Sequence, residues 1–205
     1  MVRTKNPEKT RQKLLYAAYR VVHRKGFHAA GLDEILTEAK VTKGALYHHF
    51  GSKNDLVHAV INECVRTRIV DGWVTPLAGG DARDPITRLQ QRLQHSADSV
   101  AEDELKMGCP LNNLTQELSA ADESFRAQLN EVLQTWGEGI AQALRAGQDA
   151  GSVRTDVDAE AASTFVVAAA EGIIGLSKSY RCTKRYRMGI EELIRYTETL
   201  RPLPS

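Results

Sequence analysis

The sequence has 205 residues, a formal net charge of +1, 42% hydrophobic residues and 6% aromatic residues, a mixture that favours helices over sheets. Its three cysteines, Cys64, Cys109 and Cys182, are widely spaced and form no C-x-x-C pair, which favours a reducing cytoplasm over a disulfide-rich secreted protein. The charged N-terminus precedes no apolar signal segment, and no stretch approaches the roughly 20 apolar residues of a membrane span.

Helical periodicity and helix-terminating residues recur through the N-terminal part of the chain. An N-cap at Asn6, with Pro7 after it, begins the first expected helix, which Gly26 ends. Thr42 is expected to cap a short helix, and Ser52 with Asp55 resembles a capping box. The expected helices cover residues 7–25, 32–39, 43–50 and 52 to about 77.

The rest of the chain also predicts helices. After a loop expected at Gly79-Gly80-Asp81, the predicted helices begin near residues 84, 110, 123, 158 and 184. This gives an all-α fold of about nine helices. We expect a first domain over 1–51, extended by the start of the next helix to about residue 67, and a second over 52–205.

Positive charge is concentrated at one end of the sequence. Residues 1–68 carry 13 Lys or Arg against 6 Asp or Glu, a net of +7, whereas residues 69–205 carry 14 against 20, a net of −6. The first segment is therefore expected to meet a polyanion and the second is not.

Two short helices joined by a tight connection at Lys40-Val41, after a longer first helix, form a helix-turn-helix pattern. In the second of them, Leu46 and Phe50 lie four residues apart and are expected to point inward. The other positions carry small or hydrogen-bonding side chains, which allow close approach to DNA and donate to phosphates and base edges.

The stretch FHAAGLDEILTEAKVTKGALYHHFGSKNDL, from Phe27 to Leu56, resembles the DNA-binding signature of the TetR (tetracycline-repressor-like) regulators. The segment GCPLNNL resembles one found in a subset of them. The resemblance implies an N-terminal three-helix helix-turn-helix domain, followed by a C-terminal helical domain for ligand binding and dimerisation. It implies that the last two helices of each chain form the dimer interface.

The resemblance also assigns DNA-binding residues. Lys43 is expected to reach a base edge, Lys53 to clamp a phosphate, and a basic arm to add phosphate or minor-groove contacts. The implied DNA-binding residues are Thr42, Lys43, Gly44, Ala45, Tyr47, His48, His49 and Lys53. The arm consists of Arg3, Lys5, Lys9 and Arg11.

The sequence departs from the family pattern at three places. Ala30 and Gly31 replace the usual hydroxyl residues before the second helix, and Leu36 replaces a small alanine. Lys40 stands where glycine is usual, so a positive φ at this turn would impose strain on a residue with a side chain.

Several residues suggest further sites. His48 and His49 diverge by about 100° on a helix and do not converge on one metal ion, so no metal and no cofactor are expected. Cys109 is either a reactive thiol at a helix N-terminus or a small buried residue. Polar and aromatic side chains of the second domain that could line an effector cavity are Trp73, Met107, Cys109, Asn112, Asn113, Trp136 and Phe165.

The leading hypothesis is a cytoplasmic, homodimeric repressor that releases a pseudo-palindromic DNA operator when an unknown small molecule binds its C-terminal domain. The alternative is a ligand-independent activator or architectural DNA-binding protein. An enzyme is disfavoured because the chain has no G-x-S-x-G, H-E-x-x-H or phosphate-loop motif. No membrane partner is expected.

Overall fold

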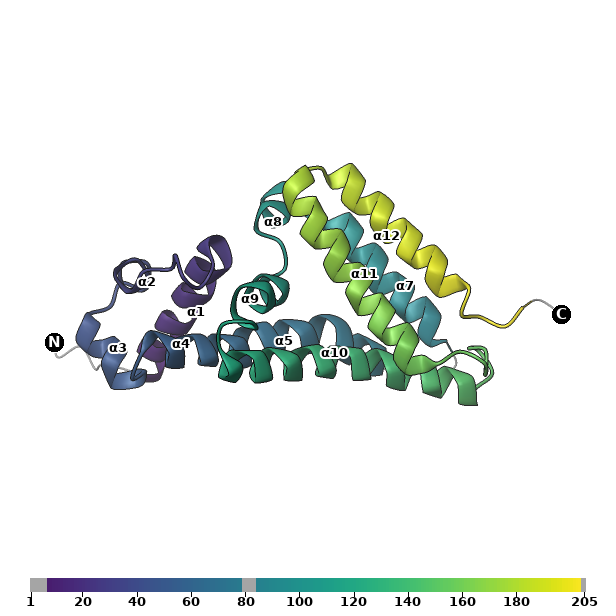
Figure 1. The fold of residues 1–205 in the computed structure, drawn as a ribbon, viewed down its shortest axis with the longest axis horizontal. Coiled ribbons are helices and arrows are strands. Elements are labelled where there is room, and N and C mark those ends of the chain that lie inside the picture. The colour runs from purple at the N-terminus through teal and green to yellow at the C-terminus, as the bar shows by residue number, and fades with distance from the viewer. Residues whose placement is uncertain (1–6, 79–83, 204–205) are drawn as a thin grey trace. The chain divides into compact units, whose positions relative to one another are not determined.

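The computed structural model describes residues 7–78 and 84–203, and every regular element within these ranges is helical (Figure 1). The all-α fold expected from the sequence is confirmed. Four expected features lie outside the described residues: the Asn6 cap, Arg3 and Lys5 of the basic arm, and the Gly79-Gly80-Asp81 loop.

The chain forms two compact units. The N-terminal unit comprises Met1–Thr67 and Asn113–Leu129, and the C-terminal unit comprises Arg68–Asn112 and Asn130–Ser205. Residues 113–129 thus group with helices that precede them by more than forty positions. The division of the chain into functional domains at residues 51 and 52 stays a prediction.

The N-terminal unit is built around α1, which contacts α2, α3 and α4. Its core is apolar, with Leu14, Ile35, Leu46, Leu56 and Phe125 among the fully buried side chains. The elements are α1 (Pro7–Lys25), α2 (Leu32–Ala39), α3 (Lys43–His49), α4 (Lys53–Val60) and η1 (Ile61–Val65), with parts of α5 (Arg66–Ile69), α9 (Pro110–Leu118) and α10 (Glu123–Asp149).

In the C-terminal unit, α12 packs against both α7 and α11, and α11 also contacts α8 (Figure 1). Leu89, Leu93, Val166 and Ile190 contribute to its buried core. The elements that belong wholly to this unit are η2 (Val70–Val74), α6 (Thr75–Ala78), α7 (Pro85–Ser99), α8 (Glu102–Met107), α11 (Ala159–Tyr180) and α12 (Thr183–Glu198).

The helix starts agree with the sequence-based expectations. Thr42, Ser52, Asp84 and Asp158 each cap a helix with a side-chain oxygen that accepts a backbone N–H. Two details differ: the helix expected after Asp84 is divided into α7 and α8, and the helix that begins at Lys53 contains the two π-helical segments η1 and η2. Such segments are frequent at functional sites.

α11 corrects the expectation that no segment is apolar enough to cross a membrane. It has 22 residues and contains an 18-residue window with a mean hydropathy of 1.4, and so meets a span's requirements by length and composition only. One such helix is weak evidence for a membrane protein. α11 packs against α8 and α12 within the C-terminal unit.

The turn after α2 contains the strained backbone that the sequence suggested. Lys40 has φ 55° and ψ 47°, the left-handed conformation that favours glycine. Its backbone N–H donates to the carbonyls at the end of α2, so the conformation closes the helix and begins the turn to α3.

Replacing Lys40 with glycine is expected to stabilise the protein by about 0.5–1 kcal/mol, because relief of left-handed strain exceeds the entropic cost of glycine. Urea unfolding followed by circular dichroism measures the change. Lys40→Ala keeps a Cβ at this position and is the matched control, expected to show no comparable gain. Equal stabilities of the glycine and alanine variants would contradict the assignment of strain.

Candidate DNA-binding surface and effector clusters

The short helix α3 presents a polar surface on a buried anchor. Leu46 and Phe50 are both buried, as their four-residue spacing predicted. The Thr42 hydroxyl accepts the backbone N–H of Ala45 at 3.3 Å and fixes the start of the helix. Of the expected DNA-binding residues on or beside α3, the exposed ones are Thr42, Lys43, Gly44, Tyr47 and His48, and the half-buried ones are Ala45 and His49.

The exposed part of α3 offers donors suited to DNA. Tyr47 is 49% exposed although it is a large aromatic residue, and its phenol is available to a phosphate. The His48 and His49 rings meet edge to face, with centroids 5.0 Å apart. Within residues 7–78 and 84–203, no three His, Cys, Asp or Glu side chains are grouped in a way that could hold a metal ion.

Lys53, expected to clamp a phosphate, is engaged within the N-terminal unit. Its Nζ donates to the Phe27 carbonyl at 2.6 Å and lies 4.5 Å from the centre of the Phe27 ring. Burial lowers the pKa of Lys53, while the nearby charge of Glu117 raises it. In this conformation Lys53 holds the turn after α1, and its contact with phosphate stays a prediction.

Sequence reasoning missed Glu117, which stabilises the same turn. Its carboxylate accepts the backbone N–H groups of Phe27 at 2.7 Å and His28 at 2.8 Å. Gly26 has φ 85°, and a Cβ there would lie 2.8 Å from a Glu117 oxygen. Glycine therefore both permits the turn and makes room for the carboxylate.

Aromatic packing beside this turn joins α4 and α10. Phe125 stacks on the His58 ring at 4.1 Å and meets the Phe27 ring at 5.3 Å. His58 Nδ1 lies 2.6 Å from Gln128 Oε1, and the Gln128 amide donates to the His58 carbonyl at 3.0 Å. These contacts explain why residues 113–129 belong to the N-terminal unit.

Arg11, expected in the basic arm, is engaged by an acidic residue. Its guanidinium forms a two-fold ion pair with Glu63, one bond being 2.8 Å, and lies over the Phe50 ring. The bonds to Glu63 raise the pKa of Arg11 and lower that of Glu63. Arg11 thus connects α1 to η1 in this structure.

Two of the expected effector residues meet in the C-terminal unit. The Trp73 ring on η2 and the Trp136 ring on α10 have centroids 4.9 Å apart. Arg92 on α7, which sequence reasoning missed, lies over Trp73 at 4.5 Å and donates from Nε to the Gly72 carbonyl. We call Trp73, Arg92 and Trp136 the tryptophan–arginine cluster.

A second cluster forms around Glu171 of α11. The Asn112 amide donates to the Glu171 carbonyl at 3.2 Å, and the Cys109 thiol interacts with the Glu171 carboxyl group. Burial raises the pKa of Glu171 to about 7, although the Cys109 hydrogen bond lowers it. Glu171 Oε2 is buried without a hydrogen-bond partner.

The structure argues against a reactive Cys109. Burial first, and the charge of Glu171 next, raise the pKa of its thiol well above the ordinary value, so the group is protonated at neutral pH. A thiol held in this form is a poor nucleophile. The expected lowering of the thiol pKa at a helix N-terminus is outweighed by desolvation.

The three remaining effector candidates are placed as follows. Asn113 belongs to the N-terminal unit, and Met107 is half-buried at the end of α8. Phe165 is exposed and contacts the Tyr196 ring, with centroids 4.5 Å apart. That all seven candidates bind the effector stays a prediction.

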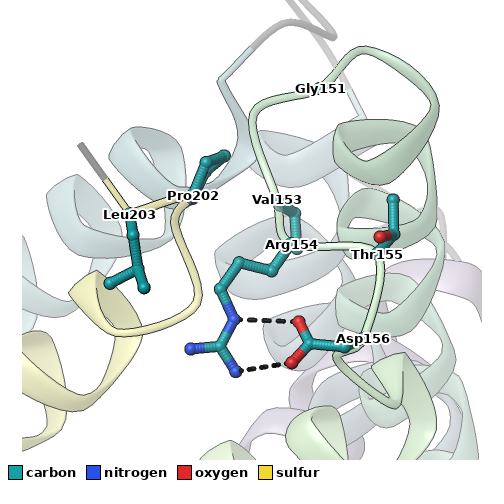
Figure 2. Close-up of a pocket in the computed structure, with 7 residues that line it drawn as sticks. All are labelled: Gly151, Val153, Arg154, Thr155, Asp156, Pro202 and Leu203. Carbon is teal, nitrogen blue, oxygen red and sulfur yellow. Dashed lines mark hydrogen bonds and ion pairs between the residues drawn. The ribbon is translucent and has the colours of Figure 1, made fainter. Parts of the chain in front are cut away.

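A separate surface pocket contains none of the seven candidates. Its volume is about 490 Å³, and Arg154 and Asp156 form a two-fold ion pair in it, at 3.0 and 3.3 Å (Figure 2). The lining residues are Gly151, Val153, Arg154, Thr155, Asp156, Pro202 and Leu203. Because the charged groups of Arg154 and Asp156 satisfy one another, this pocket is a weaker candidate for an effector than the two clusters.

Comparisons with family models, curated proteins and solved structures all find similarity to transcriptional regulators. Two family models match: "Bacterial regulatory proteins, tetR family" over residues 14–60, and "Tetracyclin repressor-like, C-terminal domain" over residues 85–193. The chain is 33% identical over 157 residues to the transcriptional regulator AcuR of Cereibacter sphaeroides, covering 73% of this chain and 68% of AcuR.

Two further comparisons extend this similarity. The HTH-type transcriptional repressor DhaR of a Mycobacterium species is 25% identical over 171 residues, covering 80% of each chain. A crystal structure of a regulatory protein TetR from Rhodobacter sphaeroides matches with a TM-score of 0.79 and 30% identity, covering 90% of this chain and 97% of that one.

The raised pKa of Glu171 predicts how stability depends on pH. Its value in the folded state, about 7, exceeds the ordinary 4.5, so its contribution is complete below pH 4.5 and is lost as pH rises toward 7. The loss is on the order of 3 kcal/mol. Glu171→Gln is expected to remove this part of the pH dependence of urea unfolding.

Glu192→Gln, at an exposed site on α12, is the control for this experiment and should retain the wild-type pH dependence. The assignment to Glu171 is wrong if the Glu171→Gln variant loses as much stability between pH 5 and pH 8 as the wild-type protein.

Proposed function

The chain belongs to the TetR family of transcriptional regulators, and on that premise we propose that it is a ligand-inducible repressor. It binds DNA through its helix-turn-helix. In the proposal, two copies hold a pseudo-palindromic operator and release it when a small molecule binds the C-terminal unit. The family consists of transcriptional regulators rather than enzymes, as the sequence motifs led us to expect.

The observation that carries the proposal is the surface of α3. Small and hydrogen-bonding side chains surround the exposed Lys43 and Tyr47, while Leu46 and Phe50 fix the helix from beneath. A short helix with this surface fits the major groove, and the positive charge of residues 1–68 favours association with DNA phosphates. The expected contacts of Thr42, Gly44, Ala45, His48 and His49 are part of this proposal.

A homodimer is supported by apolar side chains on α11 and α12. Leu176 is 59% exposed, and Phe165, Tyr180 and Met188 are also exposed on these two helices. Pairing with a second copy would cover this surface. It would also place two α3 helices in successive major grooves, roughly 34 Å apart, which requires an operator with two half-sites.

Induction by a ligand is supported by the C-terminal unit. It contains buried polar atoms without partners in both clusters, which suits a region that receives a ligand. An effector releases DNA only if it binds the DNA-free conformation more tightly than the DNA-bound one. The name of DhaR describes that relative as a repressor. Because its target is DNA, we place the protein in the cytoplasm.

Binding to the DNA immediately upstream of the protein's own gene tests the operator. A Lys43→Ala, Tyr47→Ala double variant is expected to bind at least about 10-fold more weakly and to show a shallower dependence on salt, because it loses groove and phosphate contacts. Fluorescence anisotropy over a salt series measures both. The control is Lys106→Ala, which removes an exposed lysine on α8, in the C-terminal unit.

Equal binding of the wild-type protein to the upstream DNA and to a scrambled duplex would contradict a specific operator and favour the architectural alternative. Specific binding that raises transcription of the adjacent gene would identify an activator instead.

The dimer is tested by introducing a charge on α11. Leu176→Glu is expected to shift the protein toward monomers and to weaken operator binding, because burying an unpaired carboxylate opposes association. Sedimentation velocity measures the oligomeric state. Asn130→Glu, at an exposed position of α10, is the matched control. A Leu176→Glu variant that sediments like the wild-type protein would place the dimer interface elsewhere.

A further inference from the structure

We propose that the effector is a small carboxylate with an apolar remainder, held by Arg92 and Trp136 beside Trp73. This inference deepens the proposed function and rests on its premise that the C-terminal unit binds an effector. It is carried by two buried hydrogen-bond donors in one cluster that have no acceptor.

The Arg92 guanidinium is fixed by one hydrogen bond, and another of its nitrogen atoms makes none. It lies on α7, its Nε donates to the Gly72 carbonyl, and its guanidinium carbon is 4.5 Å from the Trp73 ring centre. Its Nη1 is buried and makes no hydrogen bond. Arg88, one turn earlier on α7, donates in a similar way to the Leu77 carbonyl at 3.0 Å. The backbone bond therefore positions the Arg92 guanidinium and leaves a donor available.

No carboxylate among the described residues is found to compensate the charge of Arg92. In the part of the chain that the structure describes, the charged or titratable groups that act on it are the Tyr186 phenol and the Arg68 guanidinium. Burial is the main cause that lowers the pKa of Arg92, and Arg68 lowers it further. The Tyr186 hydroxyl is itself within 3.2 Å of Ser96 Oγ. A cation in these surroundings favours an anionic ligand.

Trp136 supplies the second donor. Its side chain is only 2% exposed, yet its Nε1 has no hydrogen-bond partner. The Trp136 and Trp73 ring centroids are 4.9 Å apart, so the indole and the guanidinium that carry the two unused donors are both neighbours of Trp73. Indole and guanidinium groups donate only and never accept, so the missing partner must be an acceptor.

The chemistry of these donors selects a carboxylate. Guanidinium groups bind planar carboxylates well, and charge-assisted bonds of this kind are the stronger ones. The indole rings provide apolar surface for the rest of the ligand. Trp73 is half-buried, so part of its side chain is accessible to solvent. It lies on η2, and π-helical segments are frequent at functional sites.

The carboxylate of Glu171 is not the acceptor that the Arg92 and Trp136 donors lack. The groups that act on the Glu171 pKa include Cys109 but not Arg92, and Glu171 is absent from those that act on Arg92. The unsatisfied atom of that cluster is an acceptor, Oε2, whereas those of the tryptophan–arginine cluster are donors. The two clusters therefore differ in the ligand groups that they fit.

Both tryptophans of the chain lie in this cluster, so intrinsic fluorescence reports on it directly. The probes are propanoate, hexanoate and benzoate, each compared with its uncharged primary amide. We expect at least one carboxylate to change the tryptophan emission and to bind at least about 10-fold more tightly than its amide, as measured by isothermal titration calorimetry.

Three variants assign the effect to individual groups. Arg92→Gln is expected to bind the carboxylate no better than the amide, and Arg92→Lys is expected to recover part of the preference because it keeps the charge. Trp136→Phe keeps a ring, removes the donor, and is expected to weaken carboxylate binding severalfold. Arg154→Gln, which removes another arginine of the same unit, is the control and should bind as the wild-type protein does. Thermal melting establishes that each variant is folded.

The inference is overturned if no carboxylate binds up to about 10 mM, a Kd beyond the range of a useful effector. It is also overturned if amides bind as well as acids, or if a folded Arg92→Gln variant keeps the preference. The proposed function fails separately: a carboxylate that binds at Arg92 without releasing the operator supports this site and contradicts induction by it. Release of the operator by a neutral compound alone would support induction by a ligand and contradict the carboxylate site.

Discussion

The turn that connects α1 to α2 depends on a carboxylate located ninety residues further along the chain. Glu117 accepts the two backbone N–H groups that follow Gly26, and Lys53 donates to the carbonyl of Phe27. These bonds satisfy backbone groups of a half-buried turn that the intrahelical bonds of α1 and α2 do not reach. The helix-turn-helix of this protein is therefore completed by α9, and not by the three helices of the motif alone.

This constraint explains the composition of the N-terminal unit. Phe125 lies against both Phe27 and His58, and Gln128 bonds to His58, so the start of α10 belongs to the same core as α1 and α4. α9 contributes residues 110–112 to the C-terminal unit and residues 113–118 to the N-terminal one.

In the C-terminal unit, by contrast, several buried polar atoms have no hydrogen-bond partner. Glu117 and Lys53 find partners, whereas Arg92 Nη1, Trp136 Nε1 and Glu171 Oε2 are buried without them. Unpaired buried polar atoms are unfavourable and therefore rare in folded proteins. Their concentration in the unit that we propose binds the effector fits a protein that exchanges some stability for the capacity to bind a ligand.

The sequence by itself determined the all-α fold, the helix-turn-helix and most helix starts, because Thr42, Ser52, Asp84 and Asp158 act through bonds within a few residues of themselves. It also identified the polar outer surface of α3, which depends only on helical periodicity, and the strained Lys40. These features are local, so neighbouring residues are sufficient to specify them.

Only the tertiary structure decided which distant residues meet. It directed Lys53 and Arg11 to partners inside the protein, raised the pKa of Cys109 by burial, and separated Phe165 from Trp73 and Trp136. It also brought Arg92 to Trp73, although α7 carries several similar polar residues and no sequence motif distinguishes this one. Burial and contact between helices arise from the packing of the whole chain, and no local pattern records them.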